Sequence, residues 1–152
     1  MDTSLIDAVL DTLSQMPKIH RALQRDVFRK ALEQTEPDLS RLHLEIMNVL
    51  QTEGTLHMVE IADLLMISKP QMSRLIDELI ELGIVKREPE LSDRRKSNIT
   101  LTPTGDEVQR RFRSNIEHNI KTWLSRLTED ELKELEASFR KVGDIVSRLR
   151  DQ

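Results

Sequence analysis

Two short runs of β-forming residues flank a polar, basic loop in the middle of the chain. The runs cover residues 84–89 and 97–101, and the loop between them includes Asp93, Arg94, Arg95 and Lys96. Such runs around a polar loop predict a β-hairpin with a charged tip. Just before it, the apolar pattern predicts two helices joined by a short turn. A helix pair followed by a basic hairpin is a winged helix-turn-helix, which can present a helix to one DNA groove and an arginine to the next.

The second helix of this pair has a charge gradient along its length. We expect it to begin after Ser68, with Pro70 in its first turn, and to end at Gly83. Its predicted apolar stripe is Met72, Leu75, Ile76, Leu79 and Leu82. Off the stripe, the first turns carry Lys69, Gln71, Ser73 and Arg74, and the last turns carry Asp77, Glu78 and Glu81. Only the first half is suited to face phosphates, as expected of a recognition helix whose N-terminal residues enter the major groove.

Amphipathic helices are predicted on both sides of this region. They cover residues 5–32, 42–53, 103–127 and 128–149, and the first helix of the pair covers residues 59–65. Pro17 is expected to kink or divide the first of them, and Ser40, Thr102 and Thr128 are expected N-caps. The predicted fold class is therefore mainly α with a small β-hairpin wing: a winged helix-turn-helix flanked by N- and C-terminal dimerisation helices.

The helices at the two ends of the chain present more apolar surface than a small winged helix can cover. We therefore expect a homodimer with two-fold symmetry, in which these helices interlock with those of a second copy. An intramolecular helical bundle in a monomer is the alternative. We expect a single domain over 1–152, with a winged helix-turn-helix lobe at 38–102 and a helical dimerisation region at 1–36 and 103–152.

The distribution of charge favours contact with nucleic acid at a few positions. The formal net charge is −4, whereas a protein that coats nucleic acid is expected to be strongly basic. Residues 31–66 contain seven acids and one base, and residues 94–126 contain eight bases and three acids. The positive field is therefore local.

Residue content excludes several chemistries. Cysteine is absent, so disulfides and thiolate metal sites are excluded. No nucleophile–base pair or glycine-rich phosphate loop stands out, and we expect no enzyme and no cofactor. The four histidines, His20, His43, His57 and His118, lack the helical spacing of a metal site. His20 and His43 are instead candidates to line a pocket between the N-terminal helix and the DNA-binding lobe.

The start of the chain carries no targeting pattern. Met1 to Ser4 is acidic rather than basic. No apolar run approaches the roughly 18 residues needed to cross a bilayer. We expect a cytoplasmic protein without a membrane partner.

Four motifs stand in a fixed order along the centre of the chain. They are a recognition-helix stretch at 61–82, a leucine-glycine-aliphatic-valine-x-arginine exit at 82–87, an aspartate-x-arginine wing at 93–95 and a leucine-threonine-x-x-glycine turn at 101–105. In this order and spacing they resemble the multiple antibiotic resistance regulator (MarR) family of transcription factors. The flanking helices match that family in length and pattern only.

The resemblance implies a triangular homodimer that binds a pseudo-palindromic operator in double-stranded DNA, usually as a repressor. It also implies a small-molecule effector pocket between the dimer helices and the DNA-binding lobe. In the recognition helix it assigns base reading to Gln71 and Arg74 and phosphate contacts to Ser68, Lys69 and Ser73. In the wing it assigns the minor groove to Arg95, its orientation to Asp93 and the DNA backbone to Arg94 and Lys96. One departure is Leu91-Ser92, where many members have proline or aspartate.

Some alternatives stay open at this point. The wing is also compatible with a solvated charged hairpin, and Arg110, Arg111 and Arg113 can either reach flanking phosphates or form a solvated helix face. The competing function is a winged-helix protein-interaction module, an antirepressor or adaptor, with which the acidic stretch 33–63 is compatible. The presence of Gln71, Arg74, Asp93 and Arg95 disfavours that alternative.

Overall fold

The chain is mainly helical in the computed structural model, which describes residues 3–93 and 96–150. In chain order the elements are α1 (Thr3–Ser14), α2 (Met16–Leu23), η1 (Gln24–Arg29), α3 (Lys30–Glu33), α4 (Arg41–Glu53), β1 (Leu56–His57), α5 (Met58–Leu64), α6 (Lys69–Glu81), β2 (Val85–Pro89), β3 (Ser97–Leu101), α7 (Pro103–Leu124) and α8 (Glu129–Arg150). The element η1 is π-helical. The predicted fold class, a mainly α winged helix-turn-helix between flanking helices, is confirmed.

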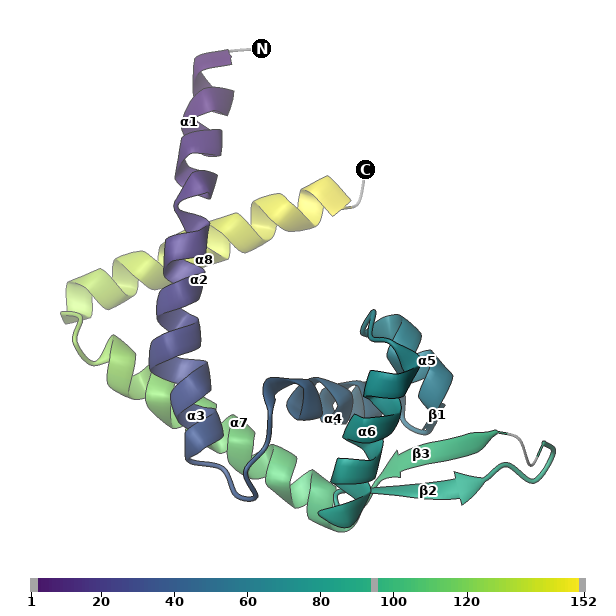
Figure 1. The fold of residues 1–152 in the computed structure, drawn as a ribbon. Helices are drawn as coiled ribbons and strands as arrows, with labels where there is room; N and C mark the ends of the chain where they lie inside the picture. The colour runs from purple at the N-terminus through teal and green to yellow at the C-terminus, as the bar shows by residue number, and fades with distance from the viewer. Residues whose placement is uncertain (1–2, 94–95, 151–152) are drawn as a thin grey trace.

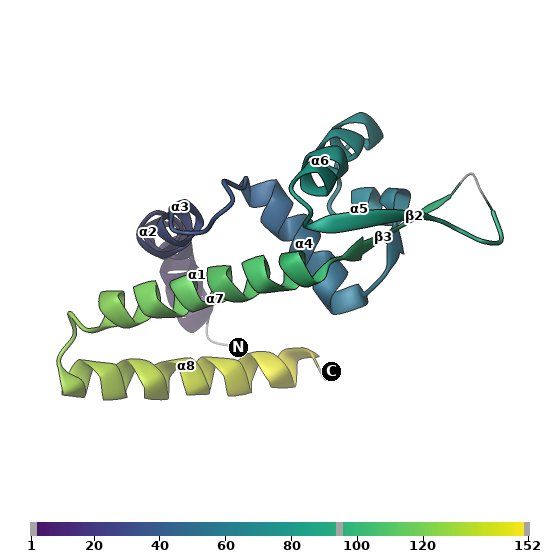
Figure 2. The ribbon, with the colours of Figure 1, turned by 90° about the horizontal axis from the view of Figure 1, so that it is seen from below.

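Helix α7 connects two parts of the molecule. The helices α4, α5 and α6 and the sheet form a lobe at its N-terminal end, and α1 to α3 form a rod that crosses its other half (Figure 1). Helix α7 contacts α4 and β3 in the lobe and η1 and α3 in the rod. After α7 the chain reverses, and α8 runs back in the opposite direction (Figure 2). The lobe and the rod are therefore held together largely through α7.

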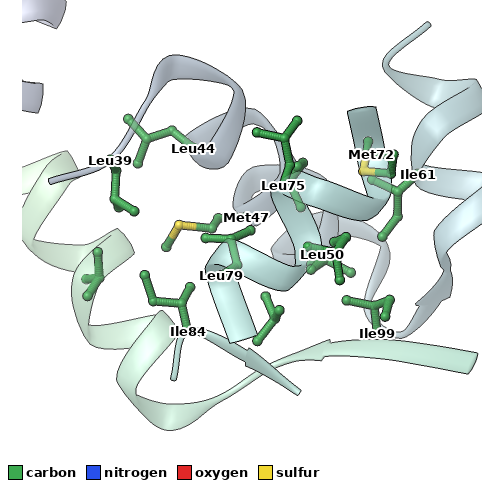
Figure 3. Close-up of a cluster of buried hydrophobic side chains, with 14 of the residues drawn as sticks. Leu39, Leu44, Met47, Leu50, Ile61, Met72, Leu75, Leu79, Ile84 and Ile99 are labelled. Atoms are coloured by element: carbon green, nitrogen blue, oxygen red, sulfur yellow. The ribbon is translucent and has the colours of Figure 1, made fainter. Parts of the chain in front are cut away.

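The core of the lobe lies between α4, α5, α6, the sheet and the first turns of α7 (Figure 3). Its fully buried side chains include Ile46, Met47, Ile61, Met72, Ile76, Leu79, Ile84, Ile99 and Val108. The prediction for the apolar stripe of α6 is confirmed for Met72, Leu75, Ile76 and Leu79. It was wrong for Leu82, which is 39% exposed because α6 ends before it and Leu82 is the C-cap residue.

The wing belongs to a sheet of three antiparallel strands in the order β1-β3-β2. Strands β2 and β3 pair as the predicted hairpin, with Val85 opposite Leu101 and Pro89 opposite Ser97. The expectation of a simple hairpin was incomplete, because β1 adds Leu56 opposite Ile99 on the far side of β3. A strand of two residues is too short to show an alternating pattern, so it could not be detected from the sequence.

The predicted helix caps are confirmed. Ser40, Ser68 and Thr102 each accept a hydrogen bond from a backbone N–H three residues later, at 3.3, 3.4 and 3.1 Å. Thr128, the other predicted N-cap, forms a capping box, in which its backbone N–H donates to the Glu131 carboxylate at 2.7 Å. These side chains satisfy amide groups that have no partner inside the helix, and they fix where each helix begins.

The N-terminal rod is divided where the sequence predicted a break. Helix α1 ends at Ser14, and Pro17 lies in the first turn of α2. The π-helical segment η1 was not predicted, and it lies where the rod meets α7. There the Asn119 side chain donates to the backbone carbonyl of Val27 at 3.3 Å, in a buried position. A π-helical segment at a contact between elements is a local departure that helical periodicity does not reveal.

Apolar faces of α1 and α8 are exposed in the single chain. In α1 they comprise Leu5, Ile6, Val9, Leu10 and Leu13, and in α8 Phe139, Val142, Ile145, Val146 and Leu149. Phe139 and Leu149 are 66% and 69% exposed. Exposed apolar area of this extent is unusual for a surface that faces water permanently. Within residues 3–93 and 96–150, no helix combines the length and the hydropathy of a membrane span.

Candidate nucleic-acid interface

The first half of α6 presents polar and basic side chains to solvent. Ser68 is the N-cap residue, and Lys69, Gln71 and Arg74 are exposed, with the Arg74 side chain 65% accessible. Ser73 is half-buried on the same turns. The N-terminal end of a helix also carries unpaired N–H groups and a partial positive charge, both of which favour anions. This end of α6 is therefore chemically suited to a phosphate-bearing partner.

The acidic second half of α6 is engaged with the rest of the lobe. Arg87 of β2 donates to Asp77 at 3.1 Å. The Glu78 carboxylate lies 2.9 Å from His43 Nε2 of α4 and accepts a hydrogen bond from Arg74 at 3.1 Å. These pairs offset two of the negative charges that would repel nucleic acid next to the basic end of the helix.

His43 was missed as a partner of α6. The sequence analysis placed it, with His20, as a candidate pocket residue, whereas its side chain is 8% exposed and packed against Glu78. The two residues are 35 positions apart in the chain. No spacing rule relates residues so distant in sequence, so this contact could only come from the folded structure.

The wing extends from the lobe at the end of β2 and β3 (Figure 1). Its turn includes a hydrogen bond of 2.9 Å from the Lys96 amide to the Asp93 carbonyl. The Lys96 side chain is exposed and Asp93 is half-buried. Arg94 and Arg95, to which the family resemblance assigns backbone and minor-groove contacts, lie outside the described residues. The described part of the wing therefore contributes Asp93 and Lys96 to the candidate interface.

Glu90 holds the base of the wing against β1. Its carboxylate accepts a hydrogen bond from the Ser92 hydroxyl at 2.7 Å and lies 2.8 Å from Nε2 of His57. The Ser92 hydrogen bond, followed by that of His57, lowers the pKa of Glu90 below its usual 4.5 because both favour the ionised carboxylate. His57 also belongs to β1, so this contact joins the third strand to the wing. The sequence analysis did not predict it.

The arginines of α7 differ in their surroundings. Arg110 and Arg111 each form an ion pair with Glu107 on the same helix, the second at 3.7 Å. Arg113 instead lines a cavity described below. Of the two alternatives left open for these arginines, the solvated helix face is favoured for Arg110 and Arg111, because Glu107 shares their charges in the isolated chain.

A sequence model described as the MarR family matches residues 38–96. That segment includes α4, α5, α6 and β2 and ends in the wing. The HTH-type transcriptional regulator YdgG of Bacillus subtilis is 27% identical over 116 residues, which make up 75% of this chain and 71% of that protein. Over residues 38–96 the chain is similar to the MarR family. This segment forms most of the winged helix-turn-helix lobe, and the relative that the chain resembles is a transcriptional regulator of the HTH type.

Solved structures extend this likeness over nearly the whole chain at the level of the fold. The transcriptional regulator Tm0710 from Thermotoga maritima superimposes with a TM-score of 0.78 at 20% identity, covering 94% of this chain and 99% of that one. A mutant of Staphylococcus aureus MepR, solved with a bound oligodeoxyribonucleotide, gives 0.71 at 23% identity and covers 89% and 97% of the two chains. The flanking helices therefore share the fold of these two solved proteins.

A cavity of about 560 Å³ lies where the MarR-family lobe meets η1, α3 and α7. Its apolar lining is Phe28, Leu32, Leu44, Phe112 and Ile116, and its charged lining is Arg29, Arg41, Glu45 and Arg113, with Arg41 and Glu45 paired at 2.9 Å. Gln109 also lines it, and the buried Oε1 of Gln109 accepts no hydrogen bond from the part of the chain that is described. His20 and His43 are absent from this lining, so the expectation that they line such a pocket was wrong. His43 lies on α4, which turns Leu44 and Asn48 toward the cavity, whereas His20 lies on α2, the helix before the η1 segment that lines it.

Metal chemistry finds no support in the described part of the chain. Within it, no group of three or more histidine, aspartate or glutamate side chains is arranged to hold a metal ion. His43 and His57 are each occupied by carboxylates of the lobe, Glu78 and Glu90. Their positions are explained by packing within the MarR-family lobe.

Proposed function

We propose that this protein is a MarR-family, sequence-specific DNA-binding repressor that works as a homodimer on a pseudo-palindromic operator and responds to a small molecule. The main support is the first half of α6, where Lys69, Gln71 and Arg74 are exposed while Asp77 and Glu78 are paired. A recognition helix needs this polarity, because its N-terminal turns enter the major groove. The oligodeoxyribonucleotide bound to the MepR mutant, which has the same fold, supports the same role.

In this proposal the contacts divide into base reading and positioning. Gln71 and Arg74 read base edges, for which amide and guanidinium groups provide paired hydrogen bonds. Ser68, Lys69 and Ser73 hold the helix against phosphates, which fixes its register without reading sequence. The wing places Arg95 in the minor groove, where its narrow, negative walls attract arginine. Asp93 orients that side chain, and Arg94 and Lys96 contact the DNA backbone.

The proposed homodimer uses the exposed apolar faces of α1 and α8. These faces lie on the regions 1–36 and 103–152, which we assign to dimerisation, while 38–102 forms the DNA-binding lobe of one domain. Burial of side chains such as Phe139 and Leu149 against a second copy removes the apolar area that a monomer leaves in water. Two-fold symmetry then presents two copies of α6 to half-sites about one helical turn apart on one face of the duplex.

The cavity beside α7 is the proposed effector site. Its aromatic and aliphatic lining suits an apolar body. Arg29 and Arg41 form ion pairs with Glu33 and Glu45, so Arg113 is the arginine of the lining best placed to meet an anionic group. The cavity is bounded by both the lobe and the rod. A ligand that binds more tightly when the lobe is in one position than in another favours that position, and it thereby changes the spacing of the two recognition helices in the dimer.

The experiment that tests the DNA-binding function is selection from a library of random duplexes by the purified full-length chain. The selected duplex and a scrambled duplex of equal composition are then titrated across a salt series. We expect an enriched sequence with two inverted half-sites, bound more tightly than the scrambled one, and an affinity that falls steeply with salt. A chain that enriches no sequence and binds both duplexes alike contradicts the proposal and favours the protein-interaction module.

A further inference from the structure

The N-terminal cap of α4 selects one tautomer of the neutral His43 ring. Its Nδ1 accepts a hydrogen bond from the backbone N–H of Ser40 at 3.2 Å, while its own backbone N–H donates to the Ser40 hydroxyl at 3.3 Å. A ring nitrogen that accepts a hydrogen bond carries no proton, so in neutral His43 the proton is on Nε2. The cap therefore makes Nε2 a donor and also fixes the plane of the ring.

The fixed donor is aimed at the recognition helix. His43 Nε2 lies 2.9 Å from Oε2 of Glu78, and the imidazole is buried at the interface of α4 and α6. A hydrogen bond from a buried, immobile donor to a carboxylate restricts the rotamers of that carboxylate. Glu78 itself is 39% exposed and would otherwise be free to turn toward solvent.

The second oxygen of the same carboxylate holds Arg74. Arg74 Nη1 donates to Glu78 Oε1 at 3.1 Å, one turn away along α6. The guanidinium has five N–H groups, and this contact uses one of its terminal nitrogens. The remaining donors stay available to an acceptor outside the protein, since the Arg74 side chain is 65% exposed.

We propose that His43, acting through Glu78, is a positioning residue that orients Arg74 for reading a base. This proposal rests on the proposed DNA-binding function and adds to it a device buried in the lobe. An unrestrained arginine loses side-chain entropy when it binds, and paired hydrogen bonds to a guanine edge need a particular guanidinium plane. A carboxylate fixed by His43 provides that orientation before DNA arrives.

Two variants break this relay in different places. His43→Asn keeps an acceptor oxygen in the position of Nδ1 for the Ser40 amide but has no group in the place of Nε2. Glu78→Gln keeps the size of the side chain but replaces one carboxylate oxygen with an NH2 group, so an acceptor is left at only one of the two positions that His43 and Arg74 contact. Glu81→Gln is the matched control, because it removes the same charge from an exposed position on the same helix. Circular dichroism and thermal unfolding check that each variant is folded.

The readout is discrimination between the duplex selected by the wild type and duplexes with single base-pair changes. We expect Glu78→Gln and His43→Asn to reduce discrimination at the base pair that depends on Arg74 by about tenfold, and other positions to change little. Glu81→Gln should discriminate as the wild type does. In an Arg74→Ala background, Glu78→Gln should change affinity by less than about twofold, since its effect passes through Arg74.

The outcomes separate the relay from the proposed function. A wild type that selects no sequence overturns both. A selective wild type whose discrimination survives Glu78→Gln and His43→Asn overturns the relay alone. The relay is also overturned if discrimination falls equally at every base pair, or if Glu78→Gln weakens binding as much in the Arg74→Ala background as in the wild type. Either result indicates a general effect on the lobe.

Discussion

Gly105 lies against the backbone carbonyl of Ile84, so closely that a Cβ added to it would be 2.3 Å from the Ile84 oxygen and 2.9 Å from Cδ2 of Leu101. The same carbonyl accepts hydrogen bonds from the amide and the hydroxyl of Thr102, at 3.0 and 3.1 Å. The exit of the recognition helix and the start of α7 therefore meet at one crowded backbone group. Only glycine fits at position 105 without a shift of the main chain.

Gly105→Ala is expected to destabilise the protein by about 2–3 kcal/mol, because the overlap involves backbone that cannot move aside freely. Thr104→Ala is the control, since Thr104 is exposed next to it and its truncation should change stability by less than about 0.5 kcal/mol. Urea unfolding at one fixed protein concentration measures both. Equal stability of Gly105→Ala and the wild type would show that the junction is looser than described.

The Glu90 contacts predict a pH-dependent contribution of the wing base to stability. The lowered pKa of Glu90 means that its ionised form is favoured in the folded state, so the contribution is present above the usual value of 4.5. It is lost as pH falls through the folded-state pKa. Glu90→Gln should therefore be less stable than the wild type at pH 7, and the difference should shrink below 4.5. Urea unfolding of both proteins at several pH values makes this comparison, and a difference that is independent of pH would argue against a role for the charge.

The apolar face of α8 predicts a dimer that a single charge can disrupt. Val142 is 56% exposed in the single chain, and Val142→Glu places a carboxylate in the proposed interface. We expect sedimentation to show a shift from dimer to monomer, with weaker DNA binding because the two half-sites are no longer bound together. Ala137→Glu adds the same charge on the opposite side of the helix and should remain dimeric. A wild-type chain that is monomeric at micromolar concentration would contradict the homodimer.

Two variants of the wing separate groove reading from phosphate contact. Arg95 lies outside the described residues, and its assignment rests on the resemblance to the family. Arg95→Ala should weaken binding to the selected duplex by about 1–3 kcal/mol and reduce its selectivity. Lys96→Ala should weaken binding to all duplexes by a smaller amount and lower the salt dependence. Negligible effects of both substitutions in a titration would remove the wing from DNA binding.

Local features of this protein could be predicted from the sequence, and contacts between distant segments could not. The caps at Ser40 and Thr102 were predictable because a cap depends on the three residues that follow it. The stripe of α6 was predictable because burial follows helical periodicity. By contrast, the pairing of His43 with Glu78 depends on how α4 and α6 cross. The two-residue strand β1 exists only because β3 offers it a free edge.

The residues of the candidate site also fall into those that local sequence predicts and those that depend on contacts between distant segments. Its exposed residues, such as Lys69 and Arg74, were identified from charge polarity along one predicted helix. The residues that hold them in place belong to other elements: His43 of α4 supports Glu78, and Arg87 of β2 neutralises Asp77. The cavity beside α7 was expected from the family, but its lining was not, because that lining comes from four separate helical segments, and one of them, η1, is a π-helical turn that the periodicity does not reveal.

The most direct test of the central claim, that the first half of α6 reads DNA sequence, compares Arg74→Ala with Lys69→Ala. Each is titrated with the selected duplex and with its scrambled counterpart at two salt concentrations. Arg74→Ala should lose about 1–3 kcal/mol on the selected duplex and little on the scrambled one, while Lys69→Ala should weaken both alike. If both variants bind the two duplexes as the wild type does, α6 is not the reading element and the account of this surface is wrong.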